Sequence, residues 1–162
     1  MEIAREDGYS IATDPSRLDR RAIHAFLESS YWSPGVPFET VDRAIDGSLP
    51  FGLYAPDGSQ AGFARVVTDR AVFAYLADLF VLDEHRGRGL GTWLVETVLA
   101  HPDLAGLRRW TLATADAHSL YARFGFVPAD AGRVMELLRR PEELYPPRVG
   151  DSPPLAPGGD PP

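Results

Sequence analysis

A long apolar segment that leads directly into a glycine-rich turn and an amphipathic helix is the feature that most constrains this sequence. Residues 71–82 read AVFAYLADLFVL, which is typical of a central strand buried on both faces of a sheet. The turn after it, EHRGRGLGTW, contains glycines at positions 87, 89 and 91. The helix predicted from about Leu90 to His101 has one apolar face, formed by Leu94, Val95, Val98 and Leu99. A strand, a tight turn and a helix that docks on the sheet predict a fold that mixes α and β elements.

Weaker patterns before and after this unit predict the remaining elements. We expect strands at residues 8–14, 50–56, 60–69, 107–114 and 133–140, with the DGS turn at 57–59 joining the second and third in a hairpin. Helices are expected within residues 14–30, 37–47 and 116–125. Asp116 is the candidate N-cap of the last helix, and Gly125 is its predicted end. The order of elements is that of a mixed α/β domain.

The composition excludes several kinds of chemistry. The chain has no cysteine, which rules out disulfides, thiolate metal ligands and cysteine nucleophiles. Its formal net charge of −7 disfavours a general affinity for nucleic acid. Histidines at positions 24, 85, 101 and 118 show no ligand spacing, so no metal site is expected.

Length and hydropathy predict one domain in the cytosol. A chain of 162 residues fits a single domain, which we expect at residues 1–140. No segment reaches the ~20 uninterrupted apolar residues of a membrane helix, and the charged start MEIAREDGYS shows no signal-peptide pattern. Residues 141–162 contain eight prolines and little apolar content, so a disordered tail is predicted there.

The glycine turn has the properties of an anion-binding site. The start of a helix presents unpaired backbone N–H groups and a partial positive charge. Glycines let the backbone approach a ligand closely, and Arg86 and Arg88 add positive charge. A dinucleotide-binding G-x-G-x-x-G motif would need glycine in place of Thr92, and the chain has no lysine for a Gly-Lys-Ser/Thr phosphate loop. On the turn alone, a loop that merely redirects the chain is an equal alternative.

Two motifs together point to a known family. Arg86, Gly89 and Gly91 form the pattern R-x-x-G-x-G between an apolar strand and an amphipathic helix, and SLYARFGF follows at residues 119–126. The pair resembles the coenzyme A pyrophosphate turn and the short helix ending in Gly-Phe of the GNAT superfamily of acyl-CoA-dependent N-acyltransferases. The resemblance covers residues 8–140 in element order and is sharp at 75–126. It implies a mixed, mostly antiparallel sheet with a central, splayed parallel pair of strands and flanking helices.

The resemblance also implies acetyl-CoA as a substrate and assigns the residues that would hold it. Backbone amides of the turn would surround the pyrophosphate, and the main chain of Leu79 and Val81 would hold the pantetheine arm like an added strand. The asparagine that is frequent in the family seven residues before the tyrosine is Thr114 here, so that contact would be weakened or replaced. The implied cofactor-binding residues of the turn are Arg86, Gly87, Arg88, Gly89, Leu90, Gly91 and Thr92.

Tyr121 stands where the usual general acid of the family stands, close to the thioester sulfur. A phenol with a pKa near ~10 can protonate a departing thiolate with a pKa of ~8.5 to 10. The alternative is a tyrosine that packs on the apolar side of its helix beside Leu120 and Phe124. Position and motif together favour the acid.

The general base is less clearly indicated. Family members that acetylate polyamines carry Glu where this chain has Ala77. Tyr75 shares a strand face with Ala77 by the period-two rule and could order a water that takes the amine proton. Asp78 is expected on the opposite face, either as a ligand for a cationic substrate or, in the preferred interpretation, as a structural ion-pair partner. His85 and His118 could shuttle protons, but surface or capping roles suit them better.

An aromatic pair, Tyr31 and Trp32, lies in the proline-containing loop ESSYWSPGVPFE between the first two predicted helices. In this family that region faces the acceptor, so the pair could form an aromatic wall around an amine. The two rings could equally plug the core under the loop.

These residues predict a cytosolic, acetyl-CoA-dependent N-acetyltransferase that moves the acetyl group directly to a primary amine of a small molecule. The absence of cysteine agrees with direct transfer in a ternary complex. One alternative is a catalytically idle module that binds or senses acyl-CoA, and another is an acyltransferase that acts on a protein amine. The acceptor and a homodimer stay open, and neither nucleic acid nor a membrane is expected as a partner.

Overall fold

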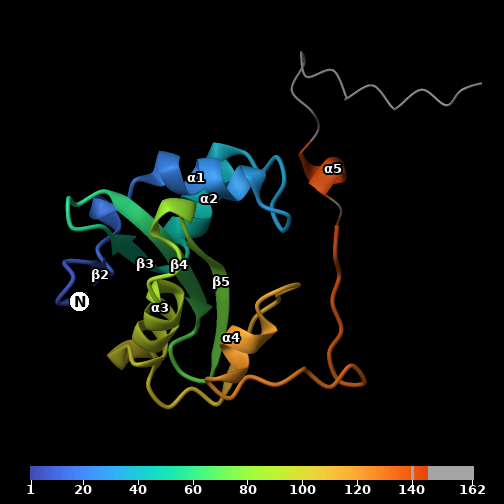
Figure 1. Cartoon of the computed structure of the whole chain (residues 1–162). Helices are drawn as coiled ribbons and strands as arrows, with labels where there is room; N and C mark the ends of the chain where they lie inside the picture. Colours follow the sequence, from blue (N-terminus) through green and yellow to red (C-terminus); the bar gives the residue numbers. More distant parts are fainter. Residues whose placement is uncertain (140, 146–162) are drawn as a thin grey trace, which may run out of the picture.

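Six strands form one sheet, and their order in the sheet, β1-β2-β3-β4-β5-β6, follows their order in the chain. Neighbouring strands are antiparallel except β5 and β6, which are parallel. The computed structural model describes residues 1–139 and 141–145 (Figure 1). The strands are β1 (Glu2–Ala4), β2 (Ser10–Ala12), β3 (Leu49–Tyr54), β4 (Gln60–Thr68), β5 (Phe73–Val81) and β6 (Arg109–Thr111).

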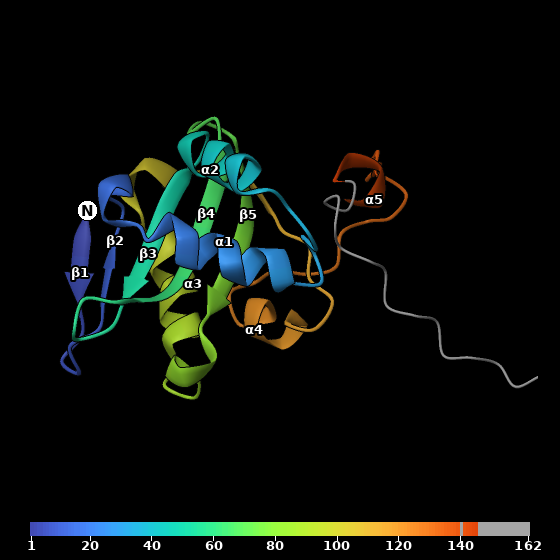
Figure 2. The same cartoon turned by 90° about the horizontal axis from the view of Figure 1, so that it is seen from above.

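Helices cover both faces of the sheet (Figures 1 and 2). α3 (Leu90–Leu99) packs on one face, and α1 (Arg20–Ser29) and α2 (Phe38–Asp46) pack on the other. The predicted mixed, mostly antiparallel sheet with a parallel pair and flanking helices is therefore confirmed, although within the described residues the pair β5–β6 lies at the end of the sheet and not at its centre. The shorter helices are η1 (Pro15–Arg17), η2 (Asp83–His85), η3 (Pro102–Leu104), α4 (His118–Ala122) and α5 (Pro141–Leu144).

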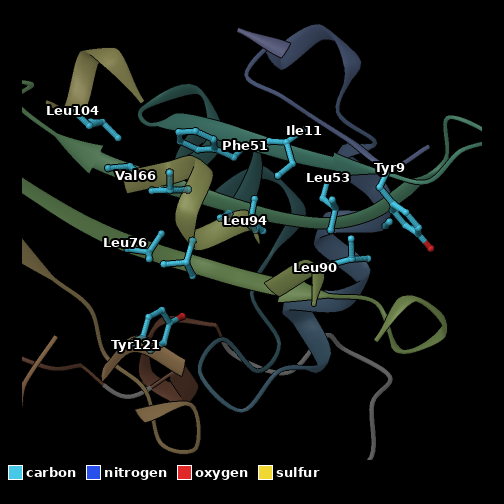
Figure 3. Packing of buried hydrophobic residues seen from close by; sticks show 14 of the residues in the cluster. Tyr9, Ile11, Phe51, Leu53, Val66, Leu76, Leu90, Leu94, Leu104 and Tyr121 are labelled. Atoms are coloured by element: carbon cyan, nitrogen blue, oxygen red, sulfur yellow. The ribbon is translucent and has the colours of Figure 1, made fainter. Parts of the chain in front are cut away.

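Two apolar clusters hold these layers together, one on each face of the sheet. On the α3 face, Leu94, Val95 and Val98 are fully buried in one cluster with the strand residues Phe51 and Val66 (Figure 3). Burial of each such side chain stabilises the fold by about 1.5–3 kcal/mol. The second cluster joins α1 and α2 to the sheet through Ile23, Leu27, Val41, Ile45, Phe63 and Phe80.

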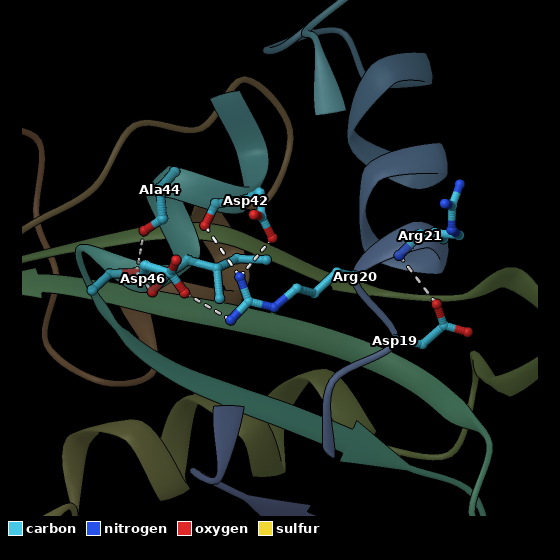
Figure 4. A network of polar contacts seen from close by, with 8 residues as sticks. Asp19, Arg20, Arg21, Asp42, Ala44 and Asp46 are labelled. Carbon is cyan, nitrogen blue, oxygen red and sulfur yellow. Dashed lines mark hydrogen bonds and ion pairs between the residues drawn. The ribbon is translucent and has the colours of Figure 1, made fainter. Parts of the chain in front are cut away.

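Polar contacts fix the start of α1 and join it to α2. The Asp19 carboxylate accepts hydrogen bonds from the backbone N–H groups of Arg21 and Ala22, at 3.1 and 2.9 Å, and thereby caps α1. Arg20 reaches across to α2, where its guanidinium lies 2.6 Å from Asp42 and 2.7 Å from Asp46 (Figure 4). The two helices are thus joined to each other as well as to the sheet.

The prediction of a closing strand at residues 133–140 is wrong. Residues 131–133 form a turn, and residues 134–139 have no regular structure. The side chains of Val134, Met135, Leu137 and Leu138 are exposed. Apolar alternation alone does not make a strand, because a strand also needs a neighbour to pair with. This segment leads away from the sheet toward α5 (Figures 1 and 2), and within residues 1–139 it pairs with no strand.

Other predicted elements are present with different limits. The strand predicted at 8–14 is the shorter β2, beside an unpredicted β1, and the strand predicted at 107–114 is the three-residue β6. Asp116 is not the N-cap of α4: Ala117 occupies that position without a side-chain capping bond, and its own N–H donates to the hydroxyl of Thr114 at 3.0 Å. Gly125, with φ of +85°, follows the end of α4 as predicted.

The predicted tail at 141–162 begins with α5 and, beyond Tyr145, lies outside the described residues. Its predicted disorder therefore stays a prediction. Among the described helices, none has the length and apolar character needed to cross a bilayer.

Candidate active site

The parallel pair β5–β6 opens soon after it begins. The two strands pair only from Phe73 opposite Arg109 to Tyr75 opposite Thr111, whereas β5 continues to Val81. In the described part of the chain, residues 76–81 therefore have a strand neighbour on the β4 side only. A cavity of about 410 Å³ lies beside this open stretch of β5. Its lining includes Tyr31, Trp32, Arg65, Tyr75, Ala77, Asp78, Leu79, Thr114, Asp116, Tyr121, Glu136 and Leu138.

A bulge in β5 changes which side chains face this cavity. The register between β4 and β5 shifts between Phe63 and Arg65, and Asp78 has a φ of +52°, which is uncommon for a residue other than glycine. The extra residue brings Asp78 to the same cavity as Tyr75. The prediction that Asp78 lies on the opposite face is therefore wrong, because the period-two rule holds only for a regular strand.

Asp78 forms an ion pair with Arg65 of β4, with 2.5 Å between the carboxylate and Nε. The preferred interpretation of Asp78 as an ion-pair partner agrees with this contact. Both side chains are largely buried, with exposed fractions of 12% for Asp78 and 18% for Arg65. The pair nevertheless lines the cavity, so it is available to a ligand.

The turn between β5 and α3 presents an open row of backbone amides. Gly87 and Gly89 have φ values of +76° and +73°, and a Cβ added to either would meet no atom within 4 Å. α3 begins at Leu90 without a side-chain cap. Within the described residues, the N–H groups from Gly87 to Thr92 donate to no other group of the chain. Such a helix start, with free amides and no obstructing side chain, fits a phosphate.

The arginines around this turn divide into two kinds. Arg86 shapes the turn, since its Nε donates to the Val81 carbonyl at 3.0 Å and its Nη1 lies 2.9 Å from Asp83. Arg88 is exposed, and toward the residues that the structure describes its side chain makes no hydrogen bond or ion pair, which suits contact with an anion. The carbonyl oxygen of Val81 is thus already engaged, although a carbonyl can accept a second bond.

Two further arginines reach the turn from distant positions. The Nη1 of Arg5 donates to the Arg88 carbonyl at 3.3 Å, and its guanidinium lies 5.4 Å from the centre of the Trp93 ring. The Nη1 of Arg123 donates to the Thr92 hydroxyl at 3.3 Å. Sequence reasoning missed both. Arg123 lies within SLYARFGF and could have been found there, whereas nothing local in the sequence connects Arg5 to the turn.

Tyr121 lies where α4 meets the cavity. Its side chain is only 8% exposed, and its ring stands edge-on to Phe126 with 5.9 Å between centroids. Figure 3 shows it at the β5 side of the larger apolar cluster. Burial raises the pKa of Tyr121 to about 12, and the nearby Tyr31 and Asp116 add to the shift. The phenol therefore keeps its proton throughout the physiological pH range.

Tyr75 is half-buried on β5 in the same cavity. Burial, followed by the negative charges of Asp78 and Glu136, raises its pKa above the usual value. A neutral phenol of this kind can orient a water molecule but cannot itself act as an anionic base near pH 7. Glu136 was missed as a cavity residue because its segment was assigned to the closing strand.

Tyr31 and Trp32 lie at the mouth of the cavity. They are 58% and 39% exposed, and their rings stand edge-on with 4.9 Å between centroids. The Tyr31 hydroxyl accepts a hydrogen bond from the backbone N–H of Ala115 at 3.0 Å, which joins the loop to the segment before α4. Exposure at this level fits a wall of the cavity better than a plug of the core.

The two histidines lie away from this cavity. His85 forms a 2.9 Å hydrogen bond through Nδ1 with the hydroxyl of Tyr9, and His118 is exposed on α4. Neither lines the cavity of about 410 Å³, although His118 lines a second cavity, of about 380 Å³, together with Tyr121. The described residues contain no group of three metal-ligating side chains.

Comparison with known proteins identifies the family. The acetyltransferase (GNAT) domain family matches residues 51–128, from within β3 to just beyond α4. A protein of Gibberella zeae with the name "Putative acetyltransferase FG08082" is 32% identical over 137 residues, which cover 71% of this chain and 76% of that protein. A crystal structure from Xanthomonas campestris pv. campestris, of a protein assigned to the GNAT family, is 50% identical. The match covers 86% of this chain and 97% of that one, with a TM-score of 0.80.

A more distant neighbour shares the fold. AAC(6')-Iy is 22% identical, the match covers 82% of this chain and 98% of that one, and the TM-score is 0.60. Its structure was solved in complex with the bisubstrate analogue CoA-S-monomethyl-acetylneamine. The matching domain, the curated relative and the fold agree, and the chain is a member of the GNAT family of acetyltransferases.

Proposed function

We propose that this protein transfers the acetyl group of acetyl-CoA directly to a primary amine of a small molecule. The observation that carries the proposal is the adjacency of two features along the open stretch of β5. The free amides of the turn lie at its end, and the cavity with Tyr121 lies along its side. One feature suits the phosphates of coenzyme A, and the other suits an acceptor.

The turn would hold the pyrophosphate through the amides from Gly87 to Thr92. Arg88 and Arg123 lie at or beside these amides and supply positive charge. Leu79 and Val81 belong to the open stretch of β5, so their main chain would hold the pantetheine arm as an added strand does. The turn suits a phosphate because Gly87 and Gly89 have left-handed backbones and leave open space where a Cβ would be. Glycine adopts this conformation at a lower free-energy cost than any other residue type.

Tyr121 would act as the general acid. When the amine nitrogen bonds to the thioester carbonyl carbon, the carbon–sulfur bond breaks and the departing thiolate takes the phenol proton. A pKa of about 12 keeps the phenol protonated at neutral pH, and it also makes Tyr121 a weaker acid toward the thiolate than an unperturbed tyrosine would be. Tyr75 would orient a water that removes the proton of the attacking amine, as its place on the cavity wall allows.

The size and charge of the cavity support a small cationic acceptor. Its volume of about 410 Å³ is within the range of small-molecule sites. Asp116 and Glu136 line it in addition to the paired Asp78, so the cavity carries excess negative charge that would attract an ammonium group. A protein amine would have to enter past Tyr31 and Trp32 at the mouth.

Two measurements test the proposal. Calorimetry should detect binding of coenzyme A, and free thiol should appear when acetyl-CoA is incubated with a panel of small amines. The protein contributes no thiol of its own, because it has no cysteine. Binding without thiol release on any amine or peptide would instead identify an idle acyl-CoA-binding module. Thiol release with peptides alone would identify a protein acetyltransferase.

A further inference from the structure

The ion pair on the cavity wall leaves most of the Arg65 guanidinium unused. Arg65 donates to Asp78 through Nε, and within the described residues its two Nη groups have no hydrogen-bond partner. A guanidinium has five N–H donors, and burial without partners is costly for such a group. At 18% exposure the side chain is partly covered, and its Nη atoms keep an opening to solvent, since neither is among the fully buried atoms that lack a partner in the described residues.

The neighbours of Arg65 leave it open toward the cavity. Its cross-strand partner on β5 is Ala77, and cross-strand partners point to the same side of the sheet. A methyl group at Ala77 does not cover the long Arg65 side chain. Asp78 holds the guanidinium through Nε alone, which leaves the Nη edge with the fork geometry that binds a carboxylate through two hydrogen bonds.

Besides the Arg65–Asp78 pair, the cavity is lined by two negative residues that are distant from Arg65 in the sequence. Asp116 precedes α4, and Glu136 lies in the segment after it. A ligand with a positive group near these carboxylates and a negative group at Arg65 would match the charges of both signs that line the cavity. A phosphate dianion suits this site less well than a carboxylate, because three carboxylates line the same cavity.

We infer that the acceptor is an amino carboxylate, a small amino acid whose carboxylate binds the Nη edge of Arg65 while its amine is acetylated. This inference rests on the proposed acetyl transfer and names the acceptor class for it. The carbon–nitrogen bond forms on the amine and the carbon–sulfur bond breaks. The thiolate takes its proton from Tyr121, and the amine loses its proton to water. Arg65 takes no part in these bond changes and acts in recognition.

The first experiment compares each amino acid with its decarboxylated partner. The pairs are phenylalanine with phenethylamine and 4-aminobutanoate with propylamine, with glycine and β-alanine added to vary the distance between amine and carboxylate. Thiol release should give a kcat/KM that is about 10- to 100-fold higher for the best acid than for its partner, as loss of a charged hydrogen-bonded contact predicts. Preference for the decarboxylated amines would overturn the inference.

The second experiment changes Arg65 itself. Arg65→Gln should lower kcat/KM for the acid about 10- to 100-fold, mainly through KM, and change that of the decarboxylated partner by a small factor only. Arg65→Lys should lie between, because it keeps the charge and loses the fork. The double variant R65Q/D78N controls for an unpaired Asp78, and thermal unfolding and coenzyme A affinity of each variant report the fold. An equal loss for acid and amine would contradict the assignment.

Direct binding separates this inference from the proposed function. Calorimetry of the protein loaded with coenzyme A should show the acid binding more tightly than its partner, and Arg65→Gln should abolish that difference. If no amine releases thiol, the acetyl transfer fails while this binding result still decides the role of Arg65. If thiol is released and the binding difference is absent, the proposed function stands and the acceptor class is wrong.

Discussion

Among single residues, Tyr121 is the one whose role most clearly separates an enzyme from a binding module. Tyr121→Phe removes one oxygen from a side chain that otherwise packs edge-on to Phe126. We expect coenzyme A affinity and the melting temperature to change little, while kcat falls by about 10²- to 10⁴-fold, the usual contribution of a positioned acid. Steady-state kinetics, under conditions in which chemistry limits the rate, measure kcat. Calorimetry measures the coenzyme A affinity and the melting temperature. Full activity of the variant would remove Tyr121 as the acid.

The raised pKa of Tyr121 has a second consequence, for stability in alkali. In the unfolded chain this phenol ionises near pH ~10, whereas in the fold it does so only near about 12. The unfolded state therefore holds fewer protons in this interval, and the free energy of unfolding must fall as the pH rises through it. Tyr121→Phe should show a shallower fall than the parent between pH 10 and 12. Denaturant unfolding at several pH values measures the slopes, and identical slopes would mean that burial shifts this pKa less than expected.

Among the elements, the turn before α3 gives a prediction with a matched control. Gly89 and Gly106 both have left-handed backbones, with φ of +73° and +76°, and open space where a Cβ would be added. Valine at either position is strained, and a loss of about 1–2 kcal/mol in unfolding free energy is expected for both variants. Only Gly89→Val should also weaken coenzyme A binding, by at least about tenfold, because the strain redirects the amides that are proposed to hold the phosphates.

Calorimetry measures the affinity of the two glycine variants for coenzyme A, and thermal unfolding measures their stability. Equal affinity for coenzyme A in Gly89→Val and Gly106→Val would show that the turn has a structural role only.

The cap of α1 gives a second prediction at this scale. Asp19 accepts two backbone hydrogen bonds at the start of α1, so Asp19→Ala should lower the unfolding free energy by about 1 kcal/mol. The replacement lies on the face opposite α3 and should leave coenzyme A affinity unchanged. Urea unfolding and calorimetry check the two halves of this expectation. Loss of affinity would mean that the α1 layer supports the turn.

For the whole molecule, the end of the chain tests where the folded domain stops. The proline-rich composition after Tyr145 predicts that deletion of residues 146–162 leaves the melting temperature and coenzyme A affinity unchanged. The deletion should not extend to Tyr145 or Leu144, because these two residues line one cavity together with Tyr31 and Trp32. Thermal unfolding of the shortened chain measures the effect. An insoluble product or a lost affinity would show that the deleted residues contact the domain.

Local patterns in the sequence were enough to predict the strand, turn and helix at residues 71–101 and the short helix at SLYARFGF. The resemblance to the GNAT family, rather than these local patterns, predicted that Tyr121 lies at the site, and Tyr121 lines the cavity beside the open stretch of β5. The strand, the turn and the helices depend on apolar periodicity over a few residues and on glycine backbones, which the chain carries wherever it folds. The same reasoning failed for residues 133–139, since a strand forms only where the segment runs beside a sheet edge and pairs with it, and this segment leads away from the sheet.

Only the tertiary structure decided which side chains share the cavity. A single extra residue in β5 turned Asp78 toward Tyr75, and that shift depends on the register with β4 rather than on the β5 sequence. Arg5 reaches Arg88 across 83 positions of the chain. Glu136 reaches the cavity wall from an irregular segment. The sequence by itself determined the glycine turn proposed to bind phosphate, because the conformation of this turn is local. The charged residues that line the cavity come from β4, from β5 and from the segments on either side of α4, and only the tertiary packing brings them together.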